Sequence, residues 1–500
     1  MTLAKLIQDN PYVLDTRGNL NVEIESITLD SRERVSGGLF FCITGSRVDS
    51  HSFAPQAIQS GCIALMVEHF LEIDVPQIMV SKGRAAMART AASFYGHPAK
   101  SLKLLGITGT KGKTTTSYLL KSICEKAGYA CGLIGTIGNM IGKRMLEGTL
   151  TTPDPIDLHR TLRQMVDQGI QTVVIEVSAH AMDMHRLDGL EFEVGCFTNF
   201  SQDHLDYFHD MENYFHAKCM FFQHGMVRNA AVNADDQRRD EILQCIRESK
   251  LEEENRPQGK RPITHMLYGI ANPSDVFARN IVHLMGGVGF HLHLSSEESI
   301  PVQLQLGGVF NVSNALAAAS CALLMGIGAE TIQEGLEAVE HVPGRMEVLP
   351  IHQPFSVILD YAHSPDSLEN ILTTARELSK KRVIVVFGCG GDRDHQKRPI
   401  MGEIAGRKAD ISILTSDNPR HEDPMEILRA IEEGIRRTDG AYEVIEHRKD
   451  AIRRALSIGA AGDVIVLAGK GHEKYQDIKG VKHPFDEKQM VDDLLQELNT

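Results

Sequence analysis

A glycine-rich segment at residues 108–116, which reads Thr-Gly-Thr-Lys-Gly-Lys-Thr-Thr-Thr, constrains the fold of this chain more than any other feature. The apolar run at 102–107 predicts a strand before it, and apolar residues at helical spacing over 118–127 predict a helix after it. In such a loop, glycines let backbone N–H groups approach a phosphate, and the helix N-terminus adds a partial positive charge. The segment therefore predicts a binding site for a nucleoside triphosphate.

The individual residues of this loop are those that a triphosphate needs. Gly109 and Gly112 open the backbone, Lys113 supplies a point charge, and the Thr114 hydroxyl can ligate magnesium. The general pattern has its first glycine where this chain has Ile107, and an ordinary turn before a helix is the alternative interpretation. The position between a strand and a helix favours nucleotide binding.

Composition narrows the class of protein. The 500 residues predict about three domains of ~100–200 residues, and 42% hydrophobic with 24% charged residues is typical of a globular protein. We expect no membrane insertion, because no apolar run approaches ~18 residues and the N-terminus lacks a secretory signal. Nine scattered cysteines without a Cys-x-x-Cys pair indicate free thiols in a reducing cytoplasm. The net charge of −14 disfavours a nucleic-acid partner.

Three α/β units are expected along the chain. The first, 1–100, ends at the chain-breaking Gly96-His97-Pro98. The second, 101–340, alternates strands with helices and predicts a mainly parallel sheet, and the third, 341–500, predicts a doubly wound, Rossmann-like sheet. We interpret the charged stretch 250–261 as a surface loop. The predicted strands lie at 24–29, 39–43, 62–67, 77–80, 102–107, 132–135, 172–176, 194–198, 291–294, 302–306, 357–361, 382–387, 411–415, 442–445 and 464–468.

Three residues of the central unit are candidates for catalysis. Glu176 ends a predicted strand, where an acidic side chain commonly reaches the magnesium of a nucleotide, and a solvated loop carboxylate is the alternative. His204 lies in a histidine-rich segment whose spacing matches no zinc motif, and most of these histidines are expected to be ordinary surface or core residues. Lys218 is either a snorkelling side chain on a predicted helix or, if buried, a neutral and reactive amine. Composition alone favours the structural role for Lys218.

Polar residues also stand at turns and strand ends further along the chain. Asn314 precedes an alanine-rich stretch and either caps that helix or reaches a ligand. Arg345 follows a Pro-Gly turn that could aim its guanidinium at a phosphate. Asp360 ends a predicted strand where a ribose or an adenine could be met.

Two arginines follow consecutive strands of the C-terminal unit. Arg393 and Arg420 would stand at one edge of the sheet, where two guanidinium groups suit a bidentate grip on a carboxylate. Ion pairing within the chain, with Asp392 or Asp394, is the alternative.

Taken in order, these segments closely resemble the Mur ligases, ATP-dependent enzymes that add amino acids to peptidoglycan precursors. The resemblance spans essentially the whole chain, and the phosphate loop of that family also lacks the first glycine of the general pattern. So many ordered matches make chance implausible. The matching segments are 30–32, 108–115, 151–153, 176–178, 203–206, 214–218, 311–315, 343–345, 360–363, 388–393, 417–420 and 469–473.

The resemblance implies an ATP site and two magnesium ions. One magnesium would be held by Thr114 and Glu176, and the other by His204 and Lys218, once carbon dioxide has carbamylated that lysine. The residues implied to be catalytic are Lys113, Glu176, His204 and Lys218. The residues implied to bind ATP are Gly109, Thr110, Lys111, Gly112, Lys113, Thr114, Thr115, Asn314, Arg345 and Asp360.

The other implied partners are two small molecules, and a monomer is expected. The contacts implied for UDP-N-acetylmuramoyl-L-alanyl-D-glutamate are Leu29, Ser31, Ser46, Arg47, Val48, Thr151, Thr152, Ser178 and Arg186. Those implied for meso-diaminopimelate are Arg393, Asp417, Asn418, Pro419, Arg420, Gly469 and Glu473. Arg420 would take the distal carboxylate of this amino acid and Glu473 the distal ammonium. Lysine lacks that carboxylate, and leaving one member of a buried charge pair unpaired costs ~2–5 kcal/mol.

Four rival functions remain to be weighed, of which a P-loop motor or nucleic-acid remodeller is disfavoured by the acidic balance and the lack of a recognisable nucleic-acid-binding module. The same ligase could use L-lysine, which the 417–420 segment disfavours, and a folylpolyglutamate-type ligase would lack the N-terminal uridine-binding unit. A non-catalytic nucleotide-binding partner would not need the candidate catalytic residues. Two departures from the family pattern are Lys111, where many relatives have Asn or Asp, and Met184, where some have a polar residue.

Overall fold

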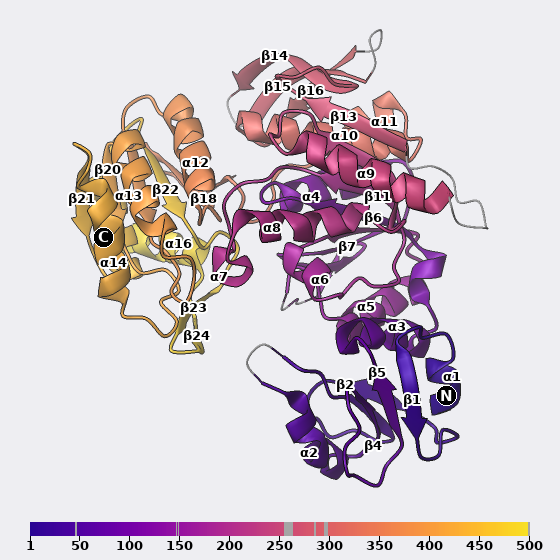
Figure 1. Ribbon diagram of the computed structural model, residues 1–500. Coiled ribbons are helices and arrows are strands. Elements are labelled where there is room, and N and C mark those ends of the chain that lie inside the picture. The colour runs from indigo at the N-terminus through magenta and orange to yellow at the C-terminus, as the bar shows by residue number, and fades with distance from the viewer. Residues whose placement is uncertain are drawn as a thin grey trace.

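The computed structural model describes residues 1–45, 48–146, 148, 150–254, 264–284, 287–294 and 299–498. It consists of three α/β units in chain order, each built on its own β-sheet, and this confirms the predicted fold class (Figure 1). The central unit lies between the N-terminal unit, at the bottom of the view, and the C-terminal unit, at the left. Within the described ranges, no helix has both the length and the apolar surface needed to cross a bilayer.

A five-stranded sheet, in the order β1-β5-β4-β3-β2, forms the N-terminal unit. The side chains of its strands form two hydrophobic cores, because successive residues of a strand point to opposite faces. Leu39 and Phe41 pack on one side, and Phe40 on the other. The edge strand β1, which pairs antiparallel with β5, was not predicted. The elements are α1 (Leu3–Ile7), β1 (Val13–Arg17), β2 (Ser26–Thr28), β3 (Gly38–Phe41), η1 (Ser50–Phe53), α2 (Ala54–Gln59), β4 (Cys62–Val67), β5 (Gln77–Val80), α3 (Gly83–Phe94) and η2 (Pro98–Ser101).

The sheet of the central unit has the order β16-β15-β14-β13-β12-β11-β6-β10-β7-β8-β9. Its middle strands, from β7 to β14, pair in parallel, and antiparallel strands extend both edges. The strands are β6 (Lys103–Thr108), β7 (Cys131–Gly135), β8 (Gly138–Ile141), β9 (Arg144–Leu146), β10 (Thr172–Glu176), β11 (Phe192–Phe197), β12 (Val227–Asn233), β13 (Thr264–Gly269), β14 (Val276–Leu284), β15 (Gly287–His293) and β16 (Ser299–Leu304).

Helices cover both faces of this central sheet, so its inner strands are apolar along nearly their whole length. The helices are α4 (Lys113–Lys126), α5 (Pro155–Asp167), α6 (Ala179–Asp183), α7 (Leu205–Phe208), α8 (Met211–Cys219), η3 (Met220–Phe222), α9 (Arg239–Glu254), α10 (Val309–Leu324) and α11 (Ala329–Glu337). The prediction of a surface loop at 250–261 is wrong for its first residues, because α9 continues through Glu254. The remainder of that stretch lies outside the described residues.

The C-terminal unit is a six-stranded sheet in the order β17-β18-β22-β19-β20-β21, parallel except at β17. A hairpin, β23–β24, stands beside it. The strands are β17 (Glu347–Val348), β18 (Ser356–Asp360), β19 (Val383–Phe387), β20 (Ile411–Leu414), β21 (Ala441–Val444), β22 (Val464–Ala468), β23 (Tyr475–Ile478) and β24 (Val481–Pro484). The helices are α12 (Pro365–Leu378), α13 (Lys397–Lys408), α14 (Pro424–Ile435), α15 (Arg448–Ile458) and α16 (Glu487–Leu498).

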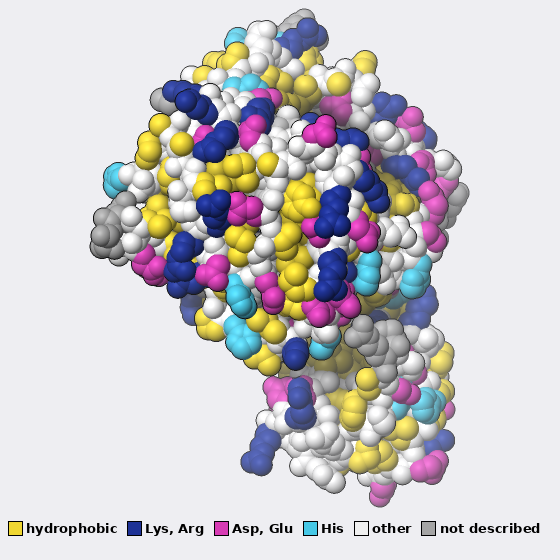
Figure 2. Space-filling model, turned by 90° about the vertical axis from the view of Figure 1, so that its left-hand side faces the viewer, with side chains coloured by type: hydrophobic (Ala, Val, Ile, Leu, Met, Phe, Trp, Pro, Cys, Tyr) yellow, Lys and Arg dark blue, Asp and Glu magenta, His cyan; other side chains and the backbone are white. Residues whose placement is uncertain are grey.

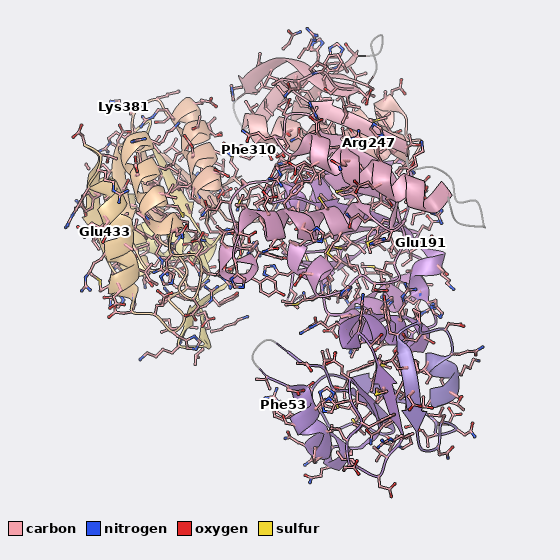
Figure 3. The ribbon with its side chains drawn as sticks, in the orientation of Figure 1. Phe53, Glu191, Arg247, Phe310, Lys381 and Glu433 are labelled. Atoms are coloured by element: carbon pink, nitrogen blue, oxygen red, sulfur yellow. The ribbon has the colours of Figure 1, made fainter. Side chains whose placement is uncertain are left out.

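Specific contacts join the three units. Asp188 of the central unit accepts hydrogen bonds from Tyr12 Oη and Arg89 Nε of the N-terminal unit, both at 2.7 Å. On the other side, Phe310 of α10 lies at the junction with the C-terminal unit and packs against its core (Figure 3). The outer face of the C-terminal unit carries interspersed basic and acidic side chains (Figure 2).

Candidate functional site

The phosphate loop, at the carboxyl end of β6, is held open by its neighbours. Gly109 has a φ of 139°, and a Cβ there would lie 1.9 Å from Thr198 Oγ1. Gly112 has a φ of 83°, and a Cβ there would lie 2.3 Å from Asn314 Oδ1. Only glycine fits either position, so the loop conformation follows from the two glycines that the sequence motif contains.

Lys113 is folded back onto its own loop. Its Nζ donates hydrogen bonds to the carbonyl oxygens of Gly109, at 2.8 Å, and Thr110, at 2.9 Å. Burial lowers the pKa of Lys113 to about 8 despite the opposing charge of Glu176. The side chain is thus held over the place where a phosphate chain would lie, and it can exchange its carbonyl partners for phosphate oxygens.

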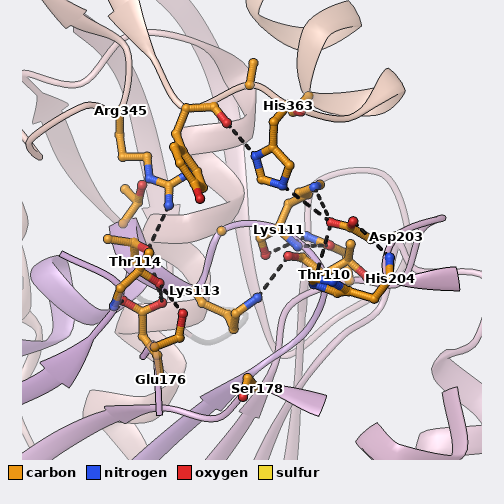
Figure 4. Close-up of a pocket in the computed structure, with 18 of the residues that line it drawn as sticks. Thr110, Lys111, Lys113, Thr114, Glu176, Ser178, Asp203, His204, Arg345 and His363 are labelled. Atoms are coloured by element: carbon orange, nitrogen blue, oxygen red, sulfur yellow. Dashed lines mark hydrogen bonds and ion pairs between the residues drawn. The ribbon is translucent and has the colours of Figure 1, made fainter. Parts of the chain in front are cut away.

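The Thr114 hydroxyl and the Glu176 carboxylate lie together beside the loop (Figure 4). Thr114 Oγ1 donates to Glu176 Oε2 at 3.1 Å, and Thr136 donates to the same carboxylate through its hydroxyl and its backbone N–H. Arg345 Nη2 donates to Thr114 Oγ1 at 3.2 Å. Glu176 is fully buried, so the alternative of a solvated loop carboxylate is wrong. A hydroxyl and a carboxylate next to a phosphate site are the ligand types that magnesium prefers.

The Asp203 carboxylate, across the site from Glu176, contacts one lysine and two histidines (Figure 4). Its Oδ2 lies 2.9 Å from Lys111 Nζ, 3.8 Å from His363 Nε2 and 3.9 Å from His204 Nε2. Burial alone would raise the pKa of Asp203, but the charges of Lys111 and the histidines overcome it and hold that pKa well below its usual range. Lys111 is therefore the ion-pair partner of Asp203, a contact that the sequence did not predict.

His204 and Lys218 lie near Asp203. Burial lowers the pKa of His204 to about 3, and the residue has a φ of 57° at the start of α7. Lys218 is 1% exposed on α8, with its Nζ 4.5 Å from the centre of the Tyr214 ring. Burial, with a contribution from Lys113, lowers the pKa of Lys218 well below its usual range, and among the described residues no carboxylate pairs with it. Burial therefore favours the neutral form of this amine, and the snorkelling interpretation is wrong because the side chain does not reach solvent.

One cavity of about 730 Å³ lies between the central and C-terminal units, and of the predicted site residues described so far Gly109 and Lys218 are not among its lining. Of the predicted site residues it contains Thr110, Lys111, Gly112, Lys113, Thr114, Thr115, Thr151, Thr152, Glu176, Ser178, Arg186, His204, Asn314, Arg345, Asp360 and Arg393. It also contains residues that were not predicted, among them Thr136, Tyr361 and His363. Tyr361 and His363 belong to a matching segment of the sequence, but nothing in the sequence marks Thr136.

Three residues that line this cavity, Asn314, Arg345 and Asp360, were predicted to complete the nucleotide site. Asn314 Nδ2 donates to Asn311 Oδ1 at 2.9 Å within α10, so it does not cap the helix. Asp360 Oδ2 accepts from the backbone N–H of Met346 at 2.7 Å, and burial raises the pKa of this carboxyl. The Arg345 guanidinium lies 4.7 Å from the centre of the Tyr361 ring.

The residues predicted to hold the dipeptide end of the precursor meet near Glu176. Thr152 Oγ1 donates to the backbone carbonyl of Glu176 at 2.6 Å, and the N–H of Ser178 donates to Thr152 Oγ1. Arg186 Nη1 donates to the carbonyl of Thr152 at 2.8 Å. Met184 also lines the cavity, where its sulfur contacts Arg186 Nη2 at 3.3 Å.

The predicted uridine contacts lie apart from this cavity, in the N-terminal unit. Leu29 and Val48 are exposed, and Ser31 donates to Gln56 Oε1 at 2.9 Å. Ser46 and Arg47 lie outside the described residues.

The predicted acceptor residues form a second cluster at the carboxyl ends of β20 and β22. Asn418 Nδ2 donates to Glu473 Oε2 at 2.8 Å, and a Cβ at Gly469 would lie 2.5 Å from Asp417 Oδ2. Arg420, with a φ of 49° after Pro419, donates from Nη1 to the carbonyl of Gly391 at 2.6 Å. Non-glycine residues with positive φ are strained and concentrate at functional sites.

Arg393 lies beside that cluster, because a Cβ at Gly390 would be 2.8 Å from Arg420 Nη1 and 3.7 Å from Arg393 Cγ. It lines the large cavity, where its Nη1 is 3.5 Å from Asp206 Oδ2 of the central unit. Neither arginine pairs with the alternative partners: Asp392 contacts His421 and Asp394 accepts from Gln202. Within the described residues, no group of three or more His, Cys, Asp or Glu side chains is arranged to hold a metal ion by itself.

The family models that match this chain divide it as the three sheets do. They are the Mur ligase family, catalytic domain, over 23–95, the Mur ligase middle domain over 107–322, and the Mur ligase, glutamate ligase domain over 344–471. This protein belongs to the Mur ligase family.

Two curated relatives and one solved structure of that family carry the same name. The UDP-N-acetylmuramoyl-L-alanyl-D-glutamate–2,6-diaminopimelate ligase of Geobacillus thermodenitrificans is 43% identical over 488 residues, which is 98% of either chain. The Clostridium botulinum enzyme of that name is 42% identical over 483 residues, 95% of this chain and 96% of its own. A solved structure of the same name has a TM-score of 0.69 and 30% identity, covering 100% of this chain and 99% of its own.

One likeness concerns the fold alone. Mycobacterium tuberculosis folylpolyglutamate synthase, solved with ADP and AMPPCP, has a TM-score of 0.63 at 17% identity and covers 78% of this chain.

Proposed function

We propose that this protein joins meso-diaminopimelate to the D-glutamate γ-carboxylate of UDP-N-acetylmuramoyl-L-alanyl-D-glutamate, using ATP. The observation that carries the proposal is the single cavity where the phosphate loop, Ser178 and Arg186 of the central unit face Arg393 of the C-terminal unit. ATP, the acid and the amine can meet there. The full-length similarity to ligases of that name supports the choice of substrates.

The phosphate loop would hold the triphosphate. Backbone N–H groups from 109–115 would surround the phosphates, and Lys113 would turn from its own loop carbonyls to the γ-phosphate. Arg345 would likewise turn from the Thr114 hydroxyl, to which it now donates, toward the phosphates. Asn314 and Asp360 would contact the nucleoside.

Two magnesium sites fit the ligand types present. Thr114 and Glu176 would hold one ion, and His204 with a modified Lys218 would hold the other. When bound, magnesium would neutralise the phosphate charge that builds up during transfer. Lys218, whose pKa is lowered by burial, would react as the free amine: it would add to carbon dioxide and lose a proton, which gives an oxygen-bearing carbamate anion.

The reaction would proceed in two transfers. The D-glutamate carboxylate, oriented by Ser178 and Arg186, attacks the γ-phosphorus in line and releases ADP. The amine of the acceptor then attacks the carbonyl carbon of the acyl phosphate and expels phosphate, which leaves an amide. Closure of the C-terminal unit over the cavity would exclude water and so protect the acyl phosphate.

The acceptor cluster explains the preference for meso-diaminopimelate over lysine. Arg420 would exchange its bond to the Gly391 carbonyl for the distal carboxylate, and Glu473 would take the distal ammonium. Lysine would leave Arg420 without that partner.

Three domains would divide this work. Residues 1–100 would hold the uridine end of the precursor, 101–340 the ATP, and 341–500 the acceptor. We also propose a monomer in the cytoplasm, since ATP is available there and its reducing conditions suit nine free cysteines.

The test is turnover with UDP-N-acetylmuramoyl-L-alanyl-D-glutamate, ATP and magnesium, following phosphate release and the amide product. Parallel reactions offer meso-diaminopimelate or L-lysine. Turnover with diaminopimelate alone is expected. Turnover with lysine alone would overturn the role of Arg420, and folded protein that binds ATP yet is silent with both acceptors would overturn the proposed function.

A further inference from the structure

A lysine that belongs to none of the predicted sites lies at the centre of the acceptor cluster. Lys470 is 0% exposed, in the loop that follows β22. Its Nζ donates to Asn418 Oδ1 at 2.9 Å and to Glu473 Oε2 at 3.4 Å. Charged lysines are seldom buried without such partners, and both partners here are predicted acceptor residues.

The ammonium of Lys470 decides which way the Asn418 amide faces. An ammonium group only donates hydrogen bonds, so the amide oxygen must face Lys470 and the amide nitrogen must face away. The backbone N–H of Asp477 also donates to Asn418 Oδ1, at 3.0 Å. Asn418 Nδ2 is thereby directed at Glu473 Oε2, which it contacts at 2.8 Å.

The same two contacts leave one oxygen of Glu473 for a ligand. Oε2 is occupied by Asn418 and Lys470, whereas Oε1 has only a 3.5 Å contact from the hydroxyl of Tyr361. Burial raises the pKa of Glu473 and the nearby charge of Asp417 adds to the rise, while Lys470 opposes both. Lys470 therefore favours an ionised Glu473 with a fixed free oxygen.

We propose that Lys470 is a positioning residue of the acceptor pocket, which holds Asn418 and Glu473 so that the free Glu473 oxygen receives the ammonium of the incoming amino acid. This inference rests on the proposed function and adds to it a residue that need not touch the substrate. Loss of Lys470 should therefore weaken binding of the acceptor and leave binding of the other two substrates unchanged, because the partners of Lys470 lie in the acceptor cluster and not in the phosphate loop.

The test measures KM for each of the three substrates in Lys470→Met and Lys470→Gln. Met removes both the charge and the donor, and we expect the KM for diaminopimelate to rise about 10- to 100-fold, the usual effect of losing hydrogen bonds to a charged group. Gln retains a donor for Asn418 and should show a smaller rise. KM for ATP and for the uridine precursor should stay within about twofold of wild type. Lys121→Met, which removes another buried lysine paired with Glu125 on α4, is the matched control and should leave all three unchanged.

A double-mutant cycle separates positioning from a general role in folding. If Lys470 acts through Asn418, the double variant Lys470→Met/Asn418→Ala should have an acceptor KM no higher than that of whichever single variant has the higher KM. Effects that multiply, an unchanged acceptor KM in Lys470→Met, or failure of both Lys470 variants to fold would each overturn the inference. Wild-type protein that turns over neither acceptor would instead overturn the proposed function and the inference with it.

Discussion

His159 on α5 should make the stability of this protein depend on pH. Its side chain is 1% exposed, and among the described residues neither ring nitrogen has a hydrogen-bond partner. Burial, with a smaller effect from His97, lowers the pKa of His159 from its usual 6.5 to about 4. The folded state therefore keeps the ring neutral where the unfolded chain already binds a proton.

The size of the effect follows from this difference in pKa. The contribution of His159 to the free energy of unfolding is fully present above about pH 6.5. It is lost as the pH falls toward 4, because only the unfolded state gains a proton on this residue in that range. The loss is about 2 kcal/mol at pH 5 and about 3 kcal/mol below pH 4, at 1.36 kcal/mol per unit. His159→Leu removes the titrating group and should therefore gain about 2 kcal/mol on wild type between pH 7.5 and pH 5.

Urea unfolding of both proteins at the two pH values measures this gain. Other titrating groups are common to both proteins and cancel in the difference. His352→Leu, at an exposed position, is the control and should follow wild type at both pH values. A difference between wild type and His159→Leu that is the same at both pH values would refute the argument from burial.

Four further substitutions test the site. Lys218→Ala should lower kcat at least about 100-fold with nucleotide binding retained, and a fully active variant would contradict the carbamate proposal. Glu176→Gln should raise the magnesium concentration needed for half-maximal ATP turnover at least about tenfold, measured by phosphate release; an unchanged magnesium dependence would exclude this carboxylate as a ligand. Arg420→Met should raise the KM for diaminopimelate at least about 30-fold but leave that for lysine nearly unchanged, so equal changes would remove Arg420 from the distal carboxylate. Gly109→Ala should cost about 1–3 kcal/mol of stability and abolish binding of labelled ATP, since its Cβ meets Thr198; normal ATP binding would show that the loop can rearrange.

The sequence predicted those parts of the fold that depend on local pattern. Strand β10 was found with its bounds, because a continuous apolar run covered on both faces has a clear signal. The edge strand β1, with the residues Val-Leu-Asp-Thr-Arg, has no such run and was missed. The short strands β8 and β9 were missed for the same reason.

Contacts between units could not be read from the chain. The pairing of Asp203 with His363 depends on how two sheets are placed, and no local pattern encodes that placement. Lys218 shows a related limit: its surroundings in sequence fit both a snorkelling and a buried side chain, and only packing decides between them. Lys470 was overlooked because a lysine between two glycines looks like a solvated loop residue, whereas it is completely buried.

The carboxylate of Asp188 has a consequence for how the protein would select its precursor. Tyr12 and Arg89 each hold one of its two oxygens, so the N-terminal unit cannot pivot about this contact without breaking a bond. If the N-terminal unit holds the uridine end as proposed, these contacts would fix the distance from that end to the phosphate loop. A precursor one amino acid shorter would end before the γ-phosphate, and one amino acid longer would pass beyond it. Length alone would then reject both, without any contact to the residue that is missing or extra.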